Sequence, residues 1–141
     1  MKLEITRSDV WAVTVEDRPA GVEEKLAALA AAGVNLEFVI GRRTPEQPGK
    51  GVVFVTPIKG PAQIKAAKAA GFKKAESLYS VRVEGPDKAG AGAMLTKALA
   101  GAGINLRGIS AAAIGKKFVA HLALDSKTDA AKAVQVLKKL G

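Results

Sequence analysis

The stretch that decides the fold is Asp-Arg-Pro-Ala-Gly at residues 17–21, because a version of it returns as Asp-Lys-Ala-Gly at residues 87–90. The same offset, from 17 to 87, carries Gly-Val-Asn-Leu at 33–36 onto Gly-Ile-Asn-Leu at 103–106. A fixed internal period of this kind indicates a repeated structural unit. The chain of 141 residues therefore reads as two copies of one module.

The first copy is predicted to run strand, helix, strand, strand, helix. Residues 10–15 are rich in β-branched side chains, which favour a strand. Pro19 suits the first turn of a helix, and Gly33 is placed to end it. The other expected elements are strands at 35–42 and 52–56, the second apolar enough to be central, a Pro- and Gly-rich hairpin loop at 41–51, and a helix that begins at Pro61 and ends at Gly71.

The second copy repeats this order. It is expected to begin with a strand at 78–84 and a helix with apolar residues at helical spacing, followed by strands at 106–113 and 118–124 across a short turn at 115–117. Thr128 or Asp129 is expected to cap the last helix. Five apolar side chains share one face of that helix: Ala130, Ala133, Val134, Leu137 and Leu140.

A final strand remains to be placed in each copy. Residues 72–76 alternate and can supply it in the first copy. The printed sequence has no such segment after Gly141, but the offset maps 72–77 back onto 2–8, where residues 3–5 alternate in the same way. We therefore expect residues 2–5 to pair into the second module and cover an otherwise open sheet edge. The predicted domains are 8–77 and 78–141, with 2–7 as the fourth strand of the second.

The composition excludes several kinds of site. The sequence has no cysteine, which excludes thiolate chemistry, and its single His121 cannot form a multi-histidine metal site. His121 is expected as a core or sheet-face residue of its strand. No nucleophile with a matching base is recognisable, so no catalytic, metal or cofactor site is predicted. With no apolar leader and no run near the ~20 residues of a membrane span, we expect a soluble cytoplasmic protein without a membrane partner.

Three features together resemble the ACT domain: the order βαββαβ, the Asp-Arg/Lys-Pro/Ala turn after the first strand, and Gly-x-Asn-Leu after the first helix. ACT domains are small ferredoxin-like modules that bind amino acids and regulate metabolic enzymes. The resemblance covers essentially the whole chain, twice. It implies an α+β fold of two ferredoxin-like modules in tandem. It also implies a non-catalytic regulatory or sensor protein that binds an amino acid or similar small molecule, acts allosterically on an enzyme, and forms a homodimer.

Both turns depart from the family pattern. The first copy places its glycine one position late, at Gly21, so a slightly different loop is expected there. The second copy has Ala89 where proline is usual.

The chemistry of a ligand site at these turns can be stated from the residues. A strand-to-helix turn exposes backbone N–H groups that can hold a carboxylate, and glycine lets a ligand approach closely. Asp17 and Asp87 could accept a ligand ammonium, or be helix caps and nothing more. Asn35 and Asn105 could simply form turns. The resemblance implies ligand sites at the seams between modules, formed by Asp17, Arg18, Gly21, Asn35, Leu36, Asp87, Lys88, Gly90, Asn105 and Leu106.

The charge of the chain keeps a second function open. The formal net charge is +9, from 22 basic and 13 acidic residues, which raises nucleic acid as a partner. The lysines are scattered over expected helix faces and turns, with no run of five or six like charges. The aromatic residues that could stack on bases are few and mostly in apolar alternation. Ferredoxin-like nucleic-acid binding is therefore the alternative, and nucleic acid is not the expected partner.

Overall fold

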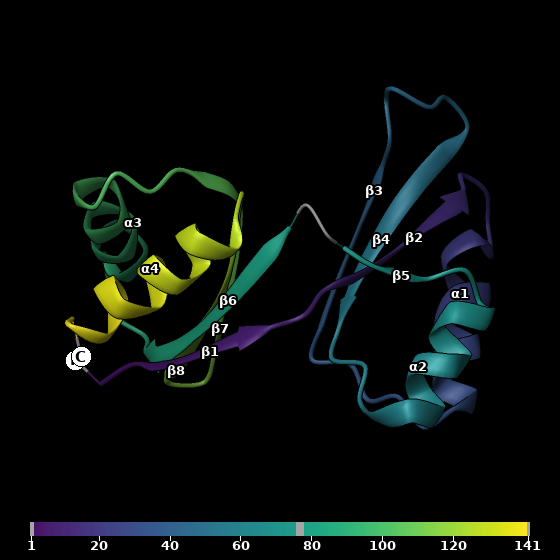
Figure 1. Cartoon of the computed structure of the whole chain (residues 1–141), viewed down its shortest axis with the longest axis horizontal. Helices are drawn as coiled ribbons and strands as arrows, with labels where there is room; N and C mark the ends of the chain where they lie inside the picture. Colours follow the sequence, from purple (N-terminus) through teal and green to yellow (C-terminus); the bar gives the residue numbers. More distant parts are fainter. Residues whose placement is uncertain (1, 76–77, 141) are drawn as a thin grey trace. The chain divides into compact units, whose positions relative to one another are not determined.

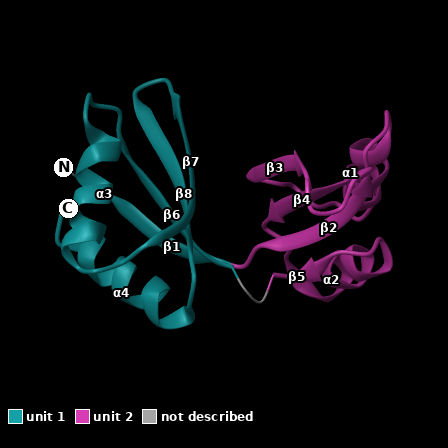
Figure 2. Cartoon of the chain, turned by 90° about the horizontal axis from the view of Figure 1, so that it is seen from above, with its two compact units in different colours: residues 1–8, 76–141 teal, residues 9–75 magenta. Residues whose placement is uncertain are grey.

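The computed structural model describes residues 2–75 and 78–140. The chain divides into two compact units, which Figure 2 colours separately: unit 1 is Met1–Ser8 with Glu76–Gly141, and unit 2 is Asp9–Ala75. Each unit holds a four-stranded antiparallel sheet, and its two helices cover one face of that sheet (Figure 1). The expected α+β architecture of two ferredoxin-like modules in tandem is confirmed.

Unit 2 contains the first copy. Its elements are β2 (Trp11–Glu16), α1 (Gly21–Ala31), β3 (Phe38–Arg43), β4 (Lys50–Thr56), α2 (Gly60–Ala69) and β5 (Lys73–Lys74), with the sheet order β3-β4-β2-β5. The apolar strand β4 is central, as predicted, and its Val53 and Val55 are 1% and 0% exposed. The final strand predicted at 72–76 appears as the short β5, and Glu76 lies outside the described residues.

The hairpin of β3 and β4 is longer than its sequence suggests. The two strands continue into the stretch predicted as a loop, where Arg42 pairs with Val52 and Arg43 with Gly51. β3 also begins at Phe38 rather than at residue 35. The prediction of a loop at 41–51 is therefore wrong at both ends. The arginines are exposed on an edge strand, where charged side chains are compatible with backbone pairing.

Unit 1 contains the second copy together with the N-terminal strand. Its elements are β1 (Glu4–Ser8), β6 (Tyr79–Pro86), α3 (Ala91–Gly101), β7 (Leu106–Ile114), β8 (Lys117–Leu124) and α4 (Lys127–Lys138), with the sheet order β1-β6-β8-β7. β1 pairs antiparallel with β6, from Glu4 opposite Glu84 to Ser8 opposite Ser80. The N-terminal segment thus completes the second sheet, as expected, although the strand covers 4–8 rather than 2–5.

Packing explains why the N-terminal segment stays in place. Leu3 and Ile5 pack against the apolar core of unit 1. Gly85 lies under Leu3, and a Cβ at this glycine would come within 2.7 Å of the Leu3 Cδ2 atom. The glycine therefore leaves the space that the leucine side chain occupies.

Each unit has its own core. The core of unit 1 includes the fully buried Leu95, Leu99 and Leu122, and that of unit 2 includes Leu29 and Phe72. Complete burial of such a side chain contributes about 1.5–3 kcal/mol. Trp11 is 6% exposed and lies in the core of unit 2, and His121 is 8% exposed on β8, both as expected from the sequence.

The cap of the last helix differs from the prediction. Neither Thr128 nor Asp129 is the capping residue of α4. Ser126 precedes the helix in an extended conformation, and its Oγ accepts a hydrogen bond from the Asp129 backbone N–H at 3.0 Å. Asp129 lies in the first turn instead, where a negative charge favours the helix dipole.

Candidate ligand site

The residue that precedes the helix has the same backbone conformation in both strand-to-helix turns. Gly90 precedes α3 with φ 83° and ψ 5°, and Ala20 precedes α1 with φ 69° and ψ −5°. Both are left-handed, a conformation that costs a residue with a side chain about 1–2 kcal/mol. Ala20 accepts this strain at the position where the second copy has glycine. The loops still differ slightly before this residue, as expected, because the Arg18 N–H donates to the Glu16 carbonyl at 2.9 Å in the first copy and no equivalent hydrogen bond is formed by Lys88 in the described part of the second.

Neither Asp17 nor Asp87 caps its helix, so the alternative interpretation of these two residues as helix caps is wrong. Ala20 and Gly90 are the N-cap residues, and neither helix start has a side-chain cap hydrogen bond. The first backbone N–H groups of a helix have no partner within the helix. The start of α3, a helix of 11 residues, therefore offers uncapped N–H groups and the positive end of the helix dipole.

A hollow of about 290 Å³ lies beside the second turn in unit 1. Asp87, Lys88 and Gly90 line it from the turn, and Leu95 lines it from α3. Most of the remaining wall is apolar and comes from the sheet: Ile109 and Ala111, Ala112 and Ala113 of β7, with Phe118 and Ala120 of β8. Charged side chains thus stand at one end of an apolar hollow, the arrangement typical of small-molecule sites.

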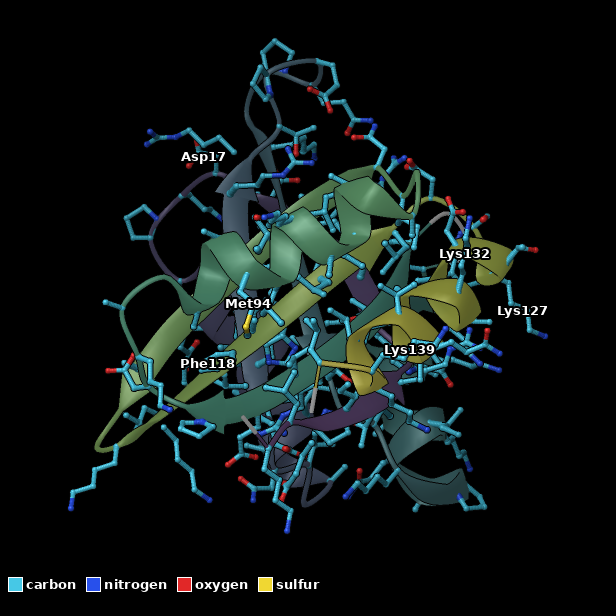
Figure 3. All side chains as sticks on the ribbon, turned by 90° about the vertical axis from the view of Figure 1, so that its left-hand side faces the viewer. Asp17, Met94, Phe118, Lys127, Lys132 and Lys139 are labelled. Atoms are coloured by element: carbon cyan, nitrogen blue, oxygen red, sulfur yellow. The ribbon has the colours of Figure 1, made fainter. Side chains whose placement is uncertain are left out.

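The apolar end of this hollow is well anchored. Phe118 is 7% exposed, and Leu95 is 1% exposed. Met94 of α3 packs against the same core cluster, with its side chain directed toward Phe118 (Figure 3). Side chains fixed in this way by packing form a rigid wall, which keeps the cost of ordering low when a ligand binds.

Charges at the second turn are not engaged within the described part of the chain. Asp87 and Lys88 are both exposed, and neither forms an ion pair with another described residue. The turn is held by its backbone instead, because the Asp87 N–H donates to the Lys116 carbonyl at 2.9 Å. The carboxylate and the ammonium are therefore available to an external group.

At the first turn the corresponding charges are engaged. The Arg43 Nε donates to the Asp17 Oδ2 at 2.8 Å. Arg18 donates to both carboxylate oxygens of Glu24, at 3.0 and 2.9 Å, and also to the Pro19 carbonyl at 3.1 Å. Arg43, from the neighbouring hairpin, therefore stands in the position that a ligand ammonium could take.

A third ion pair supports the first turn. Lys50 donates to Glu16, the last residue of β2, and this hydrogen bond with the charge of Lys50 lowers the pKa of the Glu16 carboxyl below its ordinary value of 4.5. The first turn also requires glycine at position 21 for a steric reason. A Cβ at Gly21 would lie 2.2 Å from the Glu16 carbonyl oxygen, so α1 begins too close to β2 for any side chain there.

The hollow that adjoins the first turn has a different form. It measures about 720 Å³, and all its lining residues come from the turn and α1, including Arg18, Ala20 and Val22. No strand contributes to it. Of the predicted residues of the first copy, Arg18 lines this hollow, and Asp17 and Gly21 do not.

The Gly-x-Asn-Leu segments lie away from both hollows. Asn35 and Asn105 are exposed, while Leu36 and Leu106 pack against the cores of their units. The left-handed positions belong to the preceding glycines, with φ 77° at Gly33 and 74° at Gly103, so the asparagines are not needed to form those turns. A ligand role for these four residues remains a prediction.

Sequence reasoning missed the sheet side of the hollow. The alanines 111–113 and Phe118 carry no binding motif. Three consecutive small residues on a strand allow a ligand to approach the strand closely. This pattern could indicate a site only once β7 is known to flank the turn.

Other kinds of site find no support in residues 2–75 and 78–140. Within these ranges, no three His, Cys, Asp or Glu side chains are grouped so as to hold a metal ion. The helices there are also too short or too polar to cross a membrane. Trp11, Phe72 and Phe118 are buried and cannot stack on bases. Lys127 extends outward from the start of α4 (Figure 3).

The fold is shared with solved structures of very different sequence. Protein BT0572 from Bacteroides thetaiotaomicron is similar with a TM-score of 0.77 at 19% identity, over 96% of this chain and 90% of that one. The regulatory subunit of aspartate kinase from Thermus thermophilus, in its ligand-free form, gives a TM-score of 0.66 at 13% identity, over 99% and 96%. The corresponding subunit from Thermus flavus gives 0.58 at 16% identity, over 97% of each chain.

Comparison of the sequence alone identifies no relative of this chain. No protein-family model matches the chain, and no match is found among curated proteins. At these identities the structural likeness concerns the fold, which confirms the tandem modules expected from the ACT resemblance. The chain thus has the fold of regulatory subunits of aspartate kinase.

Proposed function

We propose that this protein is a non-catalytic regulator that binds an amino acid, or a similar zwitterion, in the hollow at the second turn. The observation that carries the proposal is the combination of an uncapped start of α3 with the unengaged Asp87 and Lys88, over an apolar wall. The fold that the chain shares with regulatory subunits supports it.

Recognition of a zwitterion follows from the chemistry of these groups. The N–H groups at Gly90 and Gly92, with the Lys88 side chain, would hold a carboxylate. Asp87 would accept hydrogen bonds from an ammonium group. A ligand side chain would lie toward Phe118, which favours an apolar or small one.

Regulation requires that the ligand distinguish two arrangements of the protein. A ligand shifts an equilibrium only by its difference in affinity for the two states. We propose a cytoplasmic homodimer whose module interface is stabilised by the bound ligand, with a metabolic enzyme as the partner that responds. The domains 8–77 and 78–141, the latter completed by 2–7, are proposed as the units of this arrangement.

Thermal shift with each of the twenty amino acids tests the proposal. Saturation at about 100 times the dissociation constant adds about 2.7 kcal/mol to stability, so a ligand should raise the melting temperature by several degrees. Asp87→Asn should abolish most of this shift without lowering the melting temperature of the free protein. The matched control is Asp17→Asn, which should keep the shift.

Two results would contradict the proposal. One is the absence of any shift with all twenty amino acids. The other is an equal loss of the shift in Asp17→Asn and Asp87→Asn, which would mean that the second turn has no special role.

A further inference from the structure

One row of paired residues beside each turn differs between the two copies. Each row runs from the edge strand, through its hairpin partner, to the strand that leads into the turn. The rows are Arg43, Gly51 and Val15 in unit 2, and Ala113, Phe118 and Gly85 in unit 1. The internal offset that carries Asp17 onto Asp87 also carries Arg43 onto Ala113. Arg43 and Ala113 are therefore equivalent positions, both in the sequence and in the sheet register.

In the first copy, the edge residue of this row engages the aspartate of the turn. The Arg43 Nε donates to the Asp17 Oδ2 at 2.8 Å. In the second copy, Ala113 and Asp87 line the same hollow. The alanine methyl group has neither a charge nor a hydrogen-bond donor, and Asp87 forms no ion pair within the described residues. The second copy thus has open space where the first copy has a cation.

The central residues of the two rows differ in the complementary sense. Gly51 has no side chain, and a Cβ there would come within 2.9 Å of the Arg42 carbonyl oxygen. Phe118, at the same place in the other sheet, is 7% exposed and forms part of the wall of the hollow. The second copy therefore combines an apolar wall with a small residue at the edge. This combination leaves room for a ligand next to the Asp87 carboxylate.

We propose that position 113 determines whether the second turn is open to a ligand. Ala113 leaves the Asp87 carboxylate accessible, and an arginine at this position would engage Asp87 as Arg43 engages Asp17. The proposal rests on the proposed function and deepens it, because it names the residue that selects the second turn as the site. The ligand group that takes the place of the arginine is a cation that donates hydrogen bonds to a carboxylate, such as an ammonium.

Stability does not explain the arginine of the first copy. The side chains of Arg43 and Asp17 are 82% and 37% exposed, and an ion pair this exposed contributes little to folding. Its effect is on occupancy, because an external cation must displace the arginine before Asp17 can accept hydrogen bonds from it. Substitution of the exposed Ala113 should therefore change binding at the second turn and leave the fold intact.

The exchange of this one residue tests the proposal in the full-length chain. Ala113→Arg gives the second copy the residue of the first. Its matched control, Ala131→Arg, adds the same charge at an exposed position of α4 that does not line the hollow. Ala113→Met adds a long side chain at the same position without a charge. Each protein is titrated with each of the twenty amino acids, and the backbone amide signals of residues 88–92 are followed.

We expect Ala113→Arg to weaken binding at least about tenfold, because a ligand loses its charged hydrogen bonds to Asp87. The Ala131→Arg control should bind as wild type does, and Ala113→Met should retain most of the affinity.

A second readout needs no amino acid. In wild type, the ¹H–¹⁵N signal of the Arg43 Nε should move in Asp17→Asn, which calibrates the measurement. In Ala113→Arg, the signal of the introduced guanidinium Nε should move in the same way when Asp87→Asn is added. If Ala113→Arg fails to fold, Ala113→Lys replaces it, and the signal of the introduced ammonium group is followed instead.

Three results would overturn the proposal: an introduced cation whose signal ignores Asp87→Asn, a folded Ala113→Arg variant that binds as wild type does, or an equal loss of binding in Ala113→Met, which would mean that bulk rather than charge closes the site. Wild type that binds none of the twenty amino acids would contradict the proposed function. In that case the signal of the introduced cation still decides whether position 113 controls access to Asp87.

Discussion

In both copies the residue before the helix is left-handed, but the charged side chains of the two turns are used in opposite ways. In the first copy, Asp17 is bound by Arg43, and the left-handed position is held by Ala20. In the second, Asp87 forms no ion pair within the described residues, and the same position is held by Gly90. The difference teaches that the conformation of the turn does not by itself make a ligand site. What matters is whether the chain has already used the charges that a ligand would need.

The fourth strands of the copies differ as well, which leads to the largest expected effect. β1 pairs over five residues and packs Leu3 and Ile5 on the core, whereas β5 pairs over two. Deleting residues 2–7 should lower the free energy of unfolding by on the order of 3 kcal/mol and expose an edge of β6. Urea denaturation measures the loss. Thr6→Ala, an exposed change on the same strand, should have little effect, and a deletion variant as stable as wild type would contradict the role of β1.

Gly21→Ala probes the close approach that only the first copy makes. The added Cβ would meet the Glu16 carbonyl oxygen, so we expect a loss of about 1–3 kcal/mol in the free energy of unfolding. Gly101→Ala serves as control, because its added Cβ would meet no atom within 4 Å and should stabilise α3 by about 0.5–1 kcal/mol. Equal effects of the two changes would show that the contact at Gly21 is relaxed in solution.

Exchanging alanine and glycine at the left-handed position should change stability by smaller amounts, in opposite directions in the two copies. Gly90→Ala should destabilise the protein by about 1 kcal/mol, because alanine is strained in this conformation. Ala20→Gly should relieve the same strain and stabilise it, by somewhat less because glycine gains entropy in the unfolded chain. Chemical denaturation measures the free energy of unfolding of both variants. If both substitutions change it in the same direction, the two left-handed positions are not equivalent.

Much of the fold was readable from the sequence. The internal period and the apolar alternation predicted every helix and strand in the correct order, including the N-terminal strand of the second module. The ends of the β3–β4 loop were missed because Arg43, Lys50 and Gly51 look like loop residues, although they belong to the paired strands. Ser126 was missed because three neighbouring polar residues could each have capped α4.

The candidate site was less predictable. Asp87, Lys88 and Gly90 were named from the motif, but the motif treats Asp17 and Asp87 alike. Asp17 differs from Asp87 because it is bound by Arg43, which lies 26 positions away in the sequence and is placed beside Asp17 by the β3–β4 hairpin. No local pattern reports a contact over such a separation. The apolar side of the hollow depends in the same way on the position of β7 beside the turn.

The smallest expected effect concerns the ion pair below the first turn. Because its pKa is lowered in the folded protein, Glu16 contributes stability that is present above its ordinary pKa of 4.5 and is lost as the pH falls through the folded value. Glu16→Gln should therefore be slightly less stable than wild type at neutral pH, and the difference should disappear in acid. Melting curves at a series of pH values measure this, and a gap that widens in acid would contradict it.

The most direct test of the central claim is to map ligand contacts on both turns at once. Backbone amide shifts of the ¹⁵N-labelled full chain are recorded with each of the twenty amino acids in turn. The account predicts that at least one amino acid shifts the amides of residues 88–92 and leaves those of 18–22 in place. The reason is that Asp87 and Lys88 form no ion pair within the described residues, whereas Asp17 and Arg18 are already bound by Arg43 and Glu24. Shifts confined to 18–22, or none at either turn with any amino acid, would contradict it.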